Sequence, residues 1–586
     1  MKSLLRLKPY LWRYKKTLGL GLIAVVMSNV FTVVQPRLIG LAIDELKKGI
    51  DARTIDGTAL LGYAGLIIGL SLLAGIFMYF TRQTIIVVSR HIEFDLRNDF
   101  LRHLQKLSLK YFQNTPTGDL MAHATNDISA VRNVVGPGIM YPSDTIMTFT
   151  MVLVMMFLSN WELTLYALLP LPLVSFIVYR LGKKIHKKFQ ERQEQFSILT
   201  TKTQENLSGI RVVQSYVRED YEINQFRKLS WEYVKKNLIL AKIQSILWPL
   251  MFVLIGFSLV IIIYVGGLKV IGGELSIGTL TAFFGYLMLL IWPMIAFGWV
   301  TNLLQQGAAS MERLMKIMDT VPDIRDNEET DYSITEIKGQ VEFKNVSFKH
   351  EVSNHYVLKN ISLTIQQGMQ IAVVGYTGSG KSTFANLIPR LYEVTEGEIL
   401  IDGIPIKKIP LSVLRSNIGY VQQETFLFSD TIFENIAYGV NNPSQDVIME
   451  AAEVSQIAKD IKDFPGKYNT SIGERGITLS GGQKQRTSIA RALVRNPKIL
   501  ILDDALSSVD TYTEDEILKR LRIVMKNRTS IIISHRISTI KEADLIIVLD
   551  KGKIVERGNH EELLALGGIY ADLYDKQLLE EELESM

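Results

Sequence analysis

The sequence predicts a bundle of six membrane-spanning helices followed by an α/β domain with a largely parallel sheet. Long apolar runs are confined to the first half of the 586 residues, which gives the chain a mean hydropathy of +0.17, high for a soluble protein. The second half instead alternates short β-rich runs with helical stretches. Because a chain of this length exceeds what one hydrophobic core usually serves, two or more domains are expected.

Six apolar runs are long enough, and poor enough in charge, to cross a bilayer as helices. Buried core helices are the alternative, and they would be shorter and more charged. The third and fourth runs are separated only by the polar turn "SNWE" (Ser159–Glu162), which predicts a helical hairpin. The predicted spans lie near 17–45, 57–87, 136–158, 163–180, 246–271 and 275–303.

Basic residues predict the orientation of the bundle. Lys and Arg are concentrated in the N-terminal stretch "MKSLLRLKPYLWRYKK" and in the connections 88–130 and 181–245, whereas "SNWE" has none. The positive-inside rule then places both termini and the second domain in the cytoplasm, in a multi-pass protein of the cell membrane. The basic segment Lys47–Arg53 argues weakly against this orientation. The N-terminal stretch itself is expected to form an amphipathic elbow helix on the inner membrane face.

The two long connections are polar but keep a helical period, and turn residues interrupt them near 111–131 and 206–220. They are expected to be helices that project from the membrane with a short crosswise segment at the tip, since unstructured loops of this length are rare. The composition becomes acidic and polar at 321–338. We therefore predict a transmembrane domain over 1–320, a linker over 321–338 and the α/β domain over 339–580.

Composition excludes several kinds of function. The chain contains no Cys, which excludes disulfides, thiolate metal sites and Cys nucleophiles and is consistent with a reducing compartment. Its net charge of +4 is too small to indicate nucleic acid as a partner.

The stretch "GYTGSGKST" (Gly375–Thr383) follows a predicted strand and opens a helix. Its glycines let backbone N–H groups turn inward around phosphates, at a helix N-terminus that already favours anions. Lys381 is expected to reach the β- and γ-phosphates of ATP, and the Ser382 hydroxyl to bind Mg²⁺. Asp503, at the end of the apolar run "ILILDD", is expected to hold the same Mg²⁺ directly or through water. The predicted ATP contacts of this loop are Gly375, Thr377, Gly378, Ser379, Gly380, Lys381, Ser382 and Thr383.

A second helix start suited to anions lies at "LSGGQKQR" (Leu479–Arg486), where a serine and two glycines enter a helix. One nucleotide does not need two such helix ends from the same domain. Ser480, Gly481, Gly482 and Gln483 are therefore predicted to contact a nucleotide bound on another subunit.

These motifs, together with "SHR" (Ser534–Arg536) and in this order after six predicted spans, resemble those of ATP-binding-cassette (ABC) exporters of the half-transporter type. The stretches "IGERGITLSGGQ" (Ile472–Gln483) and "TPTGDLM" (Thr115–Met121) are similar to the exporter branch in particular. The resemblance implies a phosphate-loop ATPase domain of the RecA-like type with a helical subdomain.

The resemblance also implies roles for single residues. Gln423 would contact Mg²⁺ and sense the membrane domain, and His535 would contact the γ-phosphate. Asp510 is similar to an acid that crosses the dimer interface. The segments near 111–131 and 206–220 are similar to coupling helices that seat on the ATPase domains.

Two positions depart from the family pattern. Asp504 stands where members of the family carry a glutamate, which is the expected general base or water-orienting group for hydrolysis. His350 stands where an aromatic residue is expected to stack on adenine, and Tyr356 could substitute if the loop shifts. Both changes weaken the ATP site built on this chain's own phosphate loop. The signature stretch Ser480–Gln483, which would contact a nucleotide bound on another subunit, keeps the family pattern. The pattern resembles that of heterodimeric exporters with one hydrolysis-poor site, and a homodimer with a slow Asp base is the alternative.

The sequence thus indicates one half of an ATP-driven exporter of amphipathic compounds or drugs, with ATP and Mg²⁺ as cofactors and a second half-transporter as partner. Asp504, His535 and Gln423 are the predicted catalytic residues. A lipid or peptide exporter and an ATP-binding regulatory subunit are alternatives. Asp144, inside an apolar span, either pairs with a neighbouring helix or binds a cation.

Overall fold

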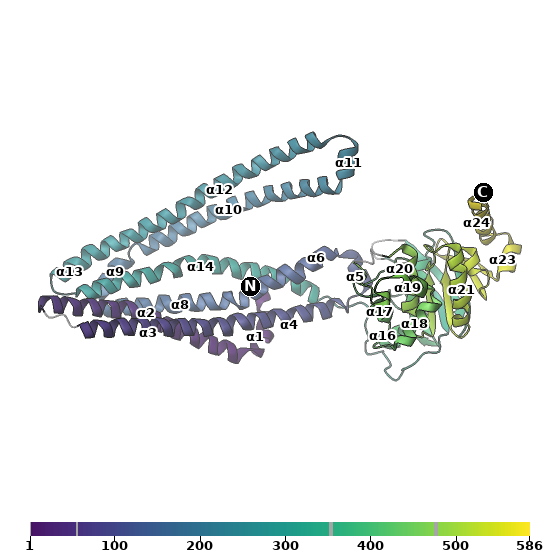
Figure 1. Ribbon diagram of the computed structural model, residues 1–586, viewed down its shortest axis with the longest axis horizontal. Helices are drawn as coiled ribbons and strands as arrows, with labels where there is room; N and C mark the ends of the chain where they lie inside the picture. The colour runs from purple at the N-terminus through teal and green to yellow at the C-terminus, as the bar shows by residue number, and fades with distance from the viewer. Residues whose placement is uncertain (1, 54–56, 351–354, 474–478, 586) are drawn as a thin grey trace. The chain divides into compact units, whose positions relative to one another are not determined.

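The computed structural model describes residues 2–53, 57–350, 355–473 and 479–585. The chain divides into two compact units (Figure 1). Met1–Leu104 and Gly118–Asp319 form a helical unit, and Gln105–Thr117 and Thr320–Met586 form an α/β unit. The short segment Gln105–Thr117 therefore packs with the α/β unit, although the chain on both sides of it belongs to the helical unit.

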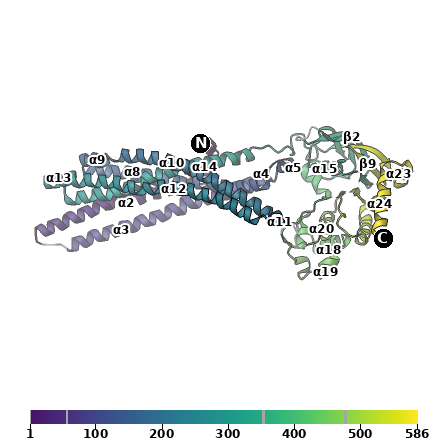
Figure 2. The ribbon, with the colours of Figure 1, turned by 90° about the horizontal axis from the view of Figure 1, so that it is seen from above.

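The helical unit begins with two short elements, η1 (Lys2–Leu7) and α1 (Lys8–Arg13), which we call the N-terminal elbow. Figures 1 and 2 show that α10 and α12 run side by side as a long hairpin whose ends are joined by the short α11. The other long helices, α2, α3, α8 and α14, pack along one another. The helices after the elbow are α2 (Lys15–Asp51), α3 (Gly57–Thr81), η2 (Arg82–Ile86), α4 (Val87–Leu104), α6 (Thr117–Ala122), η3 (His123–Asp127), α7 (Ile128–Val135), α8 (Pro137–Ser159), α9 (Trp161–Leu168), α10 (Leu171–Ser208), α11 (Ile210–Ser215), α12 (Glu219–Ile261), η4 (Ile262–Gly266), α13 (Gly267–Ile271) and α14 (Ile277–Met318).

Four helical segments within the described ranges are long and apolar enough to cross a membrane: Lys15–Asp51, Gly57–Leu104, Thr117–Ser159 and Ile277–Met318. They contain the first, second and third predicted spans, and all but the first two residues of the sixth. The fifth prediction overlaps a shorter apolar helix, Ile255–Ile271, and the fourth lies on α9 and the start of α10. A multi-pass helical domain is thus confirmed, while the number six stays a prediction.

Polar contacts join the membrane helices. Asn29 on α2 donates from Nδ2 to Asp144 Oδ1 on α8 at 2.8 Å, and the Thr148 hydroxyl donates to the Asn29 side-chain oxygen. Of the two roles expected for Asp144, the structure therefore shows pairing with a neighbouring helix. A carboxyl group without a hydrogen-bond partner is unfavourable inside the bilayer, and Asn29 supplies that partner. The hydrogen bond therefore holds α8 against α2.

The α/β unit contains two sheets. The larger has the strand order β10-β9-β3-β8-β7-β6 and is parallel except for β10 at its edge, and the smaller is antiparallel with the order β2-β1-β4-β5. The strands are β1 (Val341–Lys349), β2 (Tyr356–Ile365), β3 (Gln370–Val374), β4 (Glu396–Ile401), β5 (Ile404–Pro405), β6 (Ile418–Val421), β7 (Ile499–Asp503), β8 (Thr529–Ile533), β9 (Leu545–Asp550) and β10 (Lys553–Gly558). The helices are α5 (Leu109–Asn114), α15 (Lys381–Leu387), α16 (Leu411–Ser416), α17 (Ile432–Ala437), α18 (Gln445–Val454), α19 (Ile457–Asp463), η5 (Lys467–Asn469), α20 (Gly481–Leu493), α21 (Thr511–Met525), α22 (Ile537–Ile540), α23 (His560–Leu566) and α24 (Ile569–Ser585).

The central strands are buried on both faces, as parallel strands covered by helices must be. Along β7, Ile499 and Ile501 pack into one hydrophobic cluster, whereas Leu500 and Leu502 pack into the other. Because β3, β6, β7 and β8 are parallel, the segments that follow them all leave from one edge of the sheet. In open α/β sheets this carboxyl edge is where ligands bind.

Candidate nucleotide site

The loop between β3 and α15 holds the predicted phosphate-binding residues. Gly375, Gly378 and Gly380 have φ values of 148°, 82° and 104°, which glycine adopts without the strain that other residues would meet. A Cβ atom at Gly375 would lie 2.1 Å from the carbonyl oxygen of Leu549, so no side chain fits there. The loop is therefore a turn that only this glycine pattern can form. Its exposed tip is formed by Tyr376, Thr377 and Gly378, and Thr383 lies in the first turn of α15.

Two buried polar groups in this loop are suited to a phosphate. Lys381 Nζ donates to the carbonyl oxygens of Gly375 at 2.7 Å and Tyr376 at 3.0 Å. Burial lowers the pKa of Lys381, and the carboxylates of Asp504 and Asp503 oppose that shift. The Ser379 hydroxyl oxygen is buried and has no hydrogen-bond partner. Since a buried polar group without a partner costs stability, an anion that both side chains could bind would be stabilised here, and the loop fits the phosphates of ATP.

The two strongest candidate Mg²⁺ ligands lie in contact. Ser382 Oγ donates to Asp503 Oδ1 at 3.2 Å, and Asp503 is only 3% exposed at the end of β7. Burial raises the pKa of the Asp503 carboxyl group, and the hydrogen bond from Ser382 opposes that shift. A hydroxyl and a carboxylate oxygen held side by side next to the phosphate loop fit Mg²⁺, which prefers oxygen ligands and usually bridges to a nucleotide phosphate.

Asp504 faces a different neighbour from Asp503. Its backbone has a φ of 50°, and its N–H donates to the carbonyl oxygen of Ile533 at 2.8 Å. Gln423, which follows β6, donates from Nε2 to Asp504 Oδ2 over 3.4 Å. The predicted Mg²⁺ and water-orienting groups are thus brought together at one edge of the sheet, with Gln423 and Asp504 joined by one long hydrogen bond.

His535 follows β8 and keeps more than a third of its surface exposed. Partial burial lowers the pKa of the imidazole, and the Lys381 ammonium group adds to the effect, whereas Asp504 opposes it. The ring is therefore neutral at pH 7 and can donate one N–H to an anion. Because β8 is parallel to β3 and β7, the segment that carries His535 leaves from the same edge of the sheet.

The signature residues form the start of α20. Ser480 Oγ accepts from the Gln483 N–H at 3.3 Å, and Gln483 Oε1 accepts from the Ser480 N–H at 3.0 Å, which makes a capping box. Gln483 also donates to Asp460 Oδ1 at 2.9 Å. Ser480 and Gly481 are exposed, so a ligand from outside the chain can reach this helix end. Residues 474–478 of the predicted exporter-type stretch lie outside the described residues.

The segment from Asp504 to Asp510 is held from two sides. Gln485 on α20 is 3% exposed, and its side chain accepts from the Ser508 N–H at 2.9 Å and donates to Ser507 Oγ at 2.9 Å. Arg536, next to His535, donates to the carbonyl oxygen of Val509 at 3.2 Å. Asp510 caps α21 by accepting from the Thr513 N–H at 2.9 Å. The strand-end acids, the signature helix and the His535 loop are therefore mechanically connected.

His350 lies half-buried just after β1, against two aromatic rings. Its ring centroid is 4.9 Å from that of Phe348 and 5.5 Å from that of Tyr392, both edge-on. Gln113 on α5 donates to the Tyr392 hydroxyl at 2.6 Å, and the three rings border a cavity of about 440 Å³. Residues 351–354 lie outside the described residues, and stacking of His350 on adenine stays a prediction.

The alternative aromatic residue, Tyr356, is engaged within the smaller sheet. Its hydroxyl donates to Glu396 Oε1 at 2.5 Å, and Lys349 Nζ lies 5.4 Å from the centre of its ring. A loop shift that brought Tyr356 to adenine would have to break both contacts.

Comparisons with known proteins agree with this geometry. The ABC transporter transmembrane region matches residues 18–294, and the ABC transporter family matches residues 358–507. A probable multidrug resistance ABC transporter ATP-binding/permease protein of Bacillus subtilis (strain 168), YheI, is 39% identical over 575 residues, which cover 98% of this chain and 96% of that protein. The chain belongs to the ABC transporter family.

Two further likenesses place this ABC transporter among the exporters. The ATP-dependent lipid A-core flippase of Syntrophus aciditrophicus (strain SB) is 40% identical over 504 residues, which cover 86% of this chain and 83% of the flippase. The solved structure of a bacterial Atm1-family ABC exporter with ATP bound matches with a TM-score of 0.75 and 28% identity, over 94% of this chain and 98% of that one. The protein is an ABC exporter whose transport is coupled to ATP hydrolysis.

Sequence reasoning missed one feature of this ABC exporter and predicted a second only in part. No role was predicted for Gln485 from the sequence. Its position, two residues after the signature on a buried helix face, could have suggested one. The packing of Gln105–Thr117 with the α/β unit, through the Gln113–Tyr392 contact among others, overlaps the segment near 111–131 that was expected to seat on the ATPase domain, but it begins earlier and ends at Thr117.

Proposed function

We propose that this exporter uses ATP hydrolysis to move amphipathic compounds or drugs outward across the cell membrane. The observation that carries the proposal is the grouping of Lys381, Ser382, Asp503 and Gln423 at one sheet edge, on the same chain as a bundle of apolar helices. Lys381 would bind the terminal phosphates, Ser382 and Asp503 would hold Mg²⁺, and the ion would neutralise charge that develops on the transferred phosphoryl group.

We place both termini and the ATPase domain in the cytoplasm. The concentration of Lys and Arg in the connections 88–130 and 181–245 supports this orientation. The predicted coupling segments near 111–131 and 206–220 would then contact the ATPase domains on the same side, with α5 and α11 as their short helices.

We further propose that the chain works as one half of a heterodimer whose own ATP site is hydrolysis-poor. The exposed start of α20 supports a role toward a nucleotide bound on the partner, and Asp504 supports slow hydrolysis at the site on this chain. A second candidate function, export of a lipid, is favoured by the likeness to the lipid A-core flippase.

Reconstituted vesicles test the proposal. The complete transporter should show ATPase activity that rises with added amphipathic compound, and Lys381→Ala should abolish ATP binding at this chain's own site. The chain purified alone should show little ATPase, and co-expression with a second half-transporter that carries Asp-Glu at the matching strand end should restore it. Uptake of labelled phospholipid with no response to drugs would favour the lipid exporter, and ATP binding without transport would favour a regulatory subunit.

A further inference from the structure

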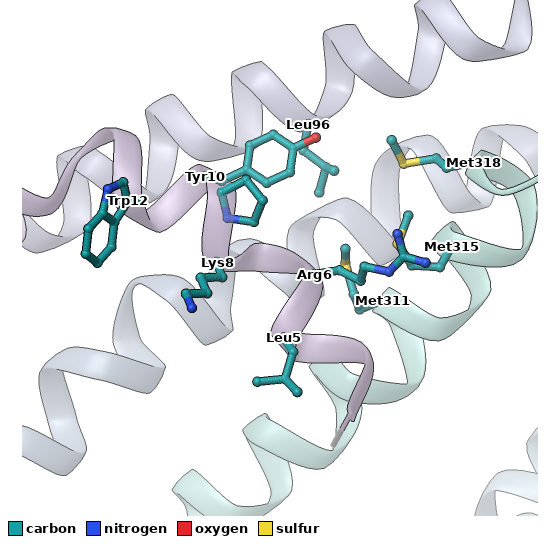
Figure 3. Close-up of a pocket in the computed structure, with 10 residues that line it drawn as sticks. Leu5, Arg6, Lys8, Tyr10, Trp12, Leu96, Met311, Met315 and Met318 are labelled. Carbon is teal, nitrogen blue, oxygen red and sulfur yellow. The ribbon is translucent and has the colours of Figure 1, made fainter.

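A cavity of about 920 Å³ lies between the N-terminal elbow and the helices α4 and α14 (Figure 3). Its α14 wall is a stripe of three methionines, Met311, Met315 and Met318, which helical spacing places on one face. The N-terminal elbow contributes the apolar side chains of Leu5 and Trp12 to the cavity lining. Methionine is flexible and polarisable, so this wall can adapt to an apolar chain of irregular shape.

The charge of this cavity is positive. Among the described residues that line it, Arg6 and Lys8 are the charged ones, and both are exposed. No carboxylate in the described part of the chain pairs with Lys8. Arg6 Nη2 lies 3.4 Å from Asp319 Oδ2, and a pair between two exposed side chains contributes little. Figure 3 shows Arg6 directed toward the methionines, with Lys8 and Trp12 leaving the elbow on its other side.

The acidic residues of α4 that face the elbow already have partners on it. Asp99 accepts from the Tyr10 hydroxyl at 2.8 Å, and Asp95 accepts from Arg13 at 2.7 Å. These contacts fix the elbow on α4 without neutralising Arg6 or Lys8. The two cations therefore stay available to an anion.

The elbow also has the composition of a membrane–water interface. It leads directly into α2, the first membrane helix, and Leu5 and Trp12 are 73% and 63% exposed. Lys15 Nζ lies 4.3 Å from the centre of the Trp12 ring. Tryptophan with neighbouring cations at the end of a spanning helix is typical of the headgroup layer.

We propose that this cavity binds one anionic phospholipid. Its phosphate would bind at Arg6, whose guanidinium group can form two hydrogen bonds to phosphate oxygens. Lys8 would add positive charge to the elbow surface, and the acyl chains would run along the methionine stripe. The cavity is large enough for the headgroup and part of the acyl chains, since pockets of roughly 300 to 1,000 Å³ hold drug-sized molecules, which are smaller than a whole phospholipid. A lipid bound there joins the elbow to α14.

Native mass spectrometry of the full-length protein tests the site. The protein is purified from vesicles of phosphatidylglycerol and phosphatidylethanolamine, and the retained lipids are counted. The wild type should retain one phosphatidylglycerol per chain. Each cation near an anionic surface contributes about fivefold in affinity, so Arg6→Gln/Lys8→Gln should bind about 25-fold more weakly. The matched control Lys16→Gln removes an exposed cation that does not line the cavity, and should retain the lipid.

A second variant separates the cavity from general surface charge. Met315→Trp keeps both cations but fills the space, and should also lose the lipid. Equal retention in the wild type and in both cavity variants would overturn the proposal. Equal losses in Lys16→Gln and in the double variant, or equal retention of phosphatidylethanolamine, would overturn it as well. If the double variant does not fold, Lys8→Gln alone, at an exposed position, provides the charge test.

Discussion

Lengthening Asp504 by one methylene group is the sharpest test of the hydrolysis-poor site. Gln423 Nε2 lies 3.4 Å from Asp504 Oδ2, beyond the usual range for an N–H···O hydrogen bond. One additional carbon–carbon bond, about 1.5 Å, would extend the carboxylate beyond its present position and toward an attacking water. Misplacing a catalytic group by about 1 Å can cost about 10²-fold, and general-base catalysis contributes about 10² to 10⁴. Asp504→Glu should therefore speed hydrolysis at this site about 10²-fold.

ATP binding should change little in Asp504→Glu, because Lys381, Ser382 and Asp503 keep their contacts. The substitution should also lower stability slightly. Because Asp tolerates the φ of 50° better than Glu, the free energy of unfolding should fall by about 1 kcal/mol. Single-turnover hydrolysis of labelled ATP, in a heterodimer whose partner site is disabled, measures the effect. Asp504→Asn is the matched control, of the same size without the charge, and should slow the intact heterodimer only modestly.

Replacing the glutamate of the partner subunit should stop the heterodimer. Two results would refute the reasoning. Robust ATPase activity from this chain alone would show that the aspartate is long enough, and complete loss of activity in Asp504→Asn would show that its carboxylate drives turnover.

Three further substitutions test other parts of the site. Lys381→Ala should abolish nucleotide photolabelling of this subunit while membrane insertion is unchanged, and undiminished labelling would contradict the phosphate-loop assignment. Ser480→Arg should reduce hydrolysis at the partner's site more than any change at Asp504 does, because a bulky cation would block closure; full ATPase activity of the co-expressed pair would argue against the trans arrangement. Gln485→Leu keeps the volume but leaves buried groups of the Asp504–Asp510 segment unpaired, at about 1 to 3 kcal/mol each, so thermal unfolding should occur at a lower temperature and steady-state hydrolysis should fall while photolabelling persists. An unchanged unfolding temperature would show that the hydrogen bonds of Gln485 are not needed for stability.

The parts of the fold that repeat a local pattern could be predicted from the sequence. Apolar runs predicted the four helices within the described ranges that are long enough to span a membrane. The glycine spacing around Lys381 predicted the loop whose φ values only glycine accepts. The contact between Ser382 and Asp503 followed from motif order, because parallel strands bring their carboxyl ends to one edge.

What the sequence left open depends on tertiary neighbours. The family resemblance predicted that the segment near 111–131 contacts the ATPase domain. The helical period of 88–130 could not show that the packed stretch is Gln105–Thr117, because a polar helix does not indicate where its contacts begin and end. The position of Gln485 just after the signature is visible in the sequence, but its partner, the backbone at Ser508, is not. For Asp144, the sequence could not separate pairing from cation binding, because that depends on Asn29 of another helix.

The packing of Gln105–Thr117 has a practical consequence for anyone who expresses the ATPase domain as a fragment. A cut within 321–338 would leave behind a part of the domain's own fold, including the buried Leu107 and the Gln113 contact to Tyr392. The truncated protein would expose the face that these residues cover and would tend to self-associate, as newly exposed apolar surface does. A synthetic peptide of residues 105–117, added back, should cover that face again and raise the melting temperature of the fragment.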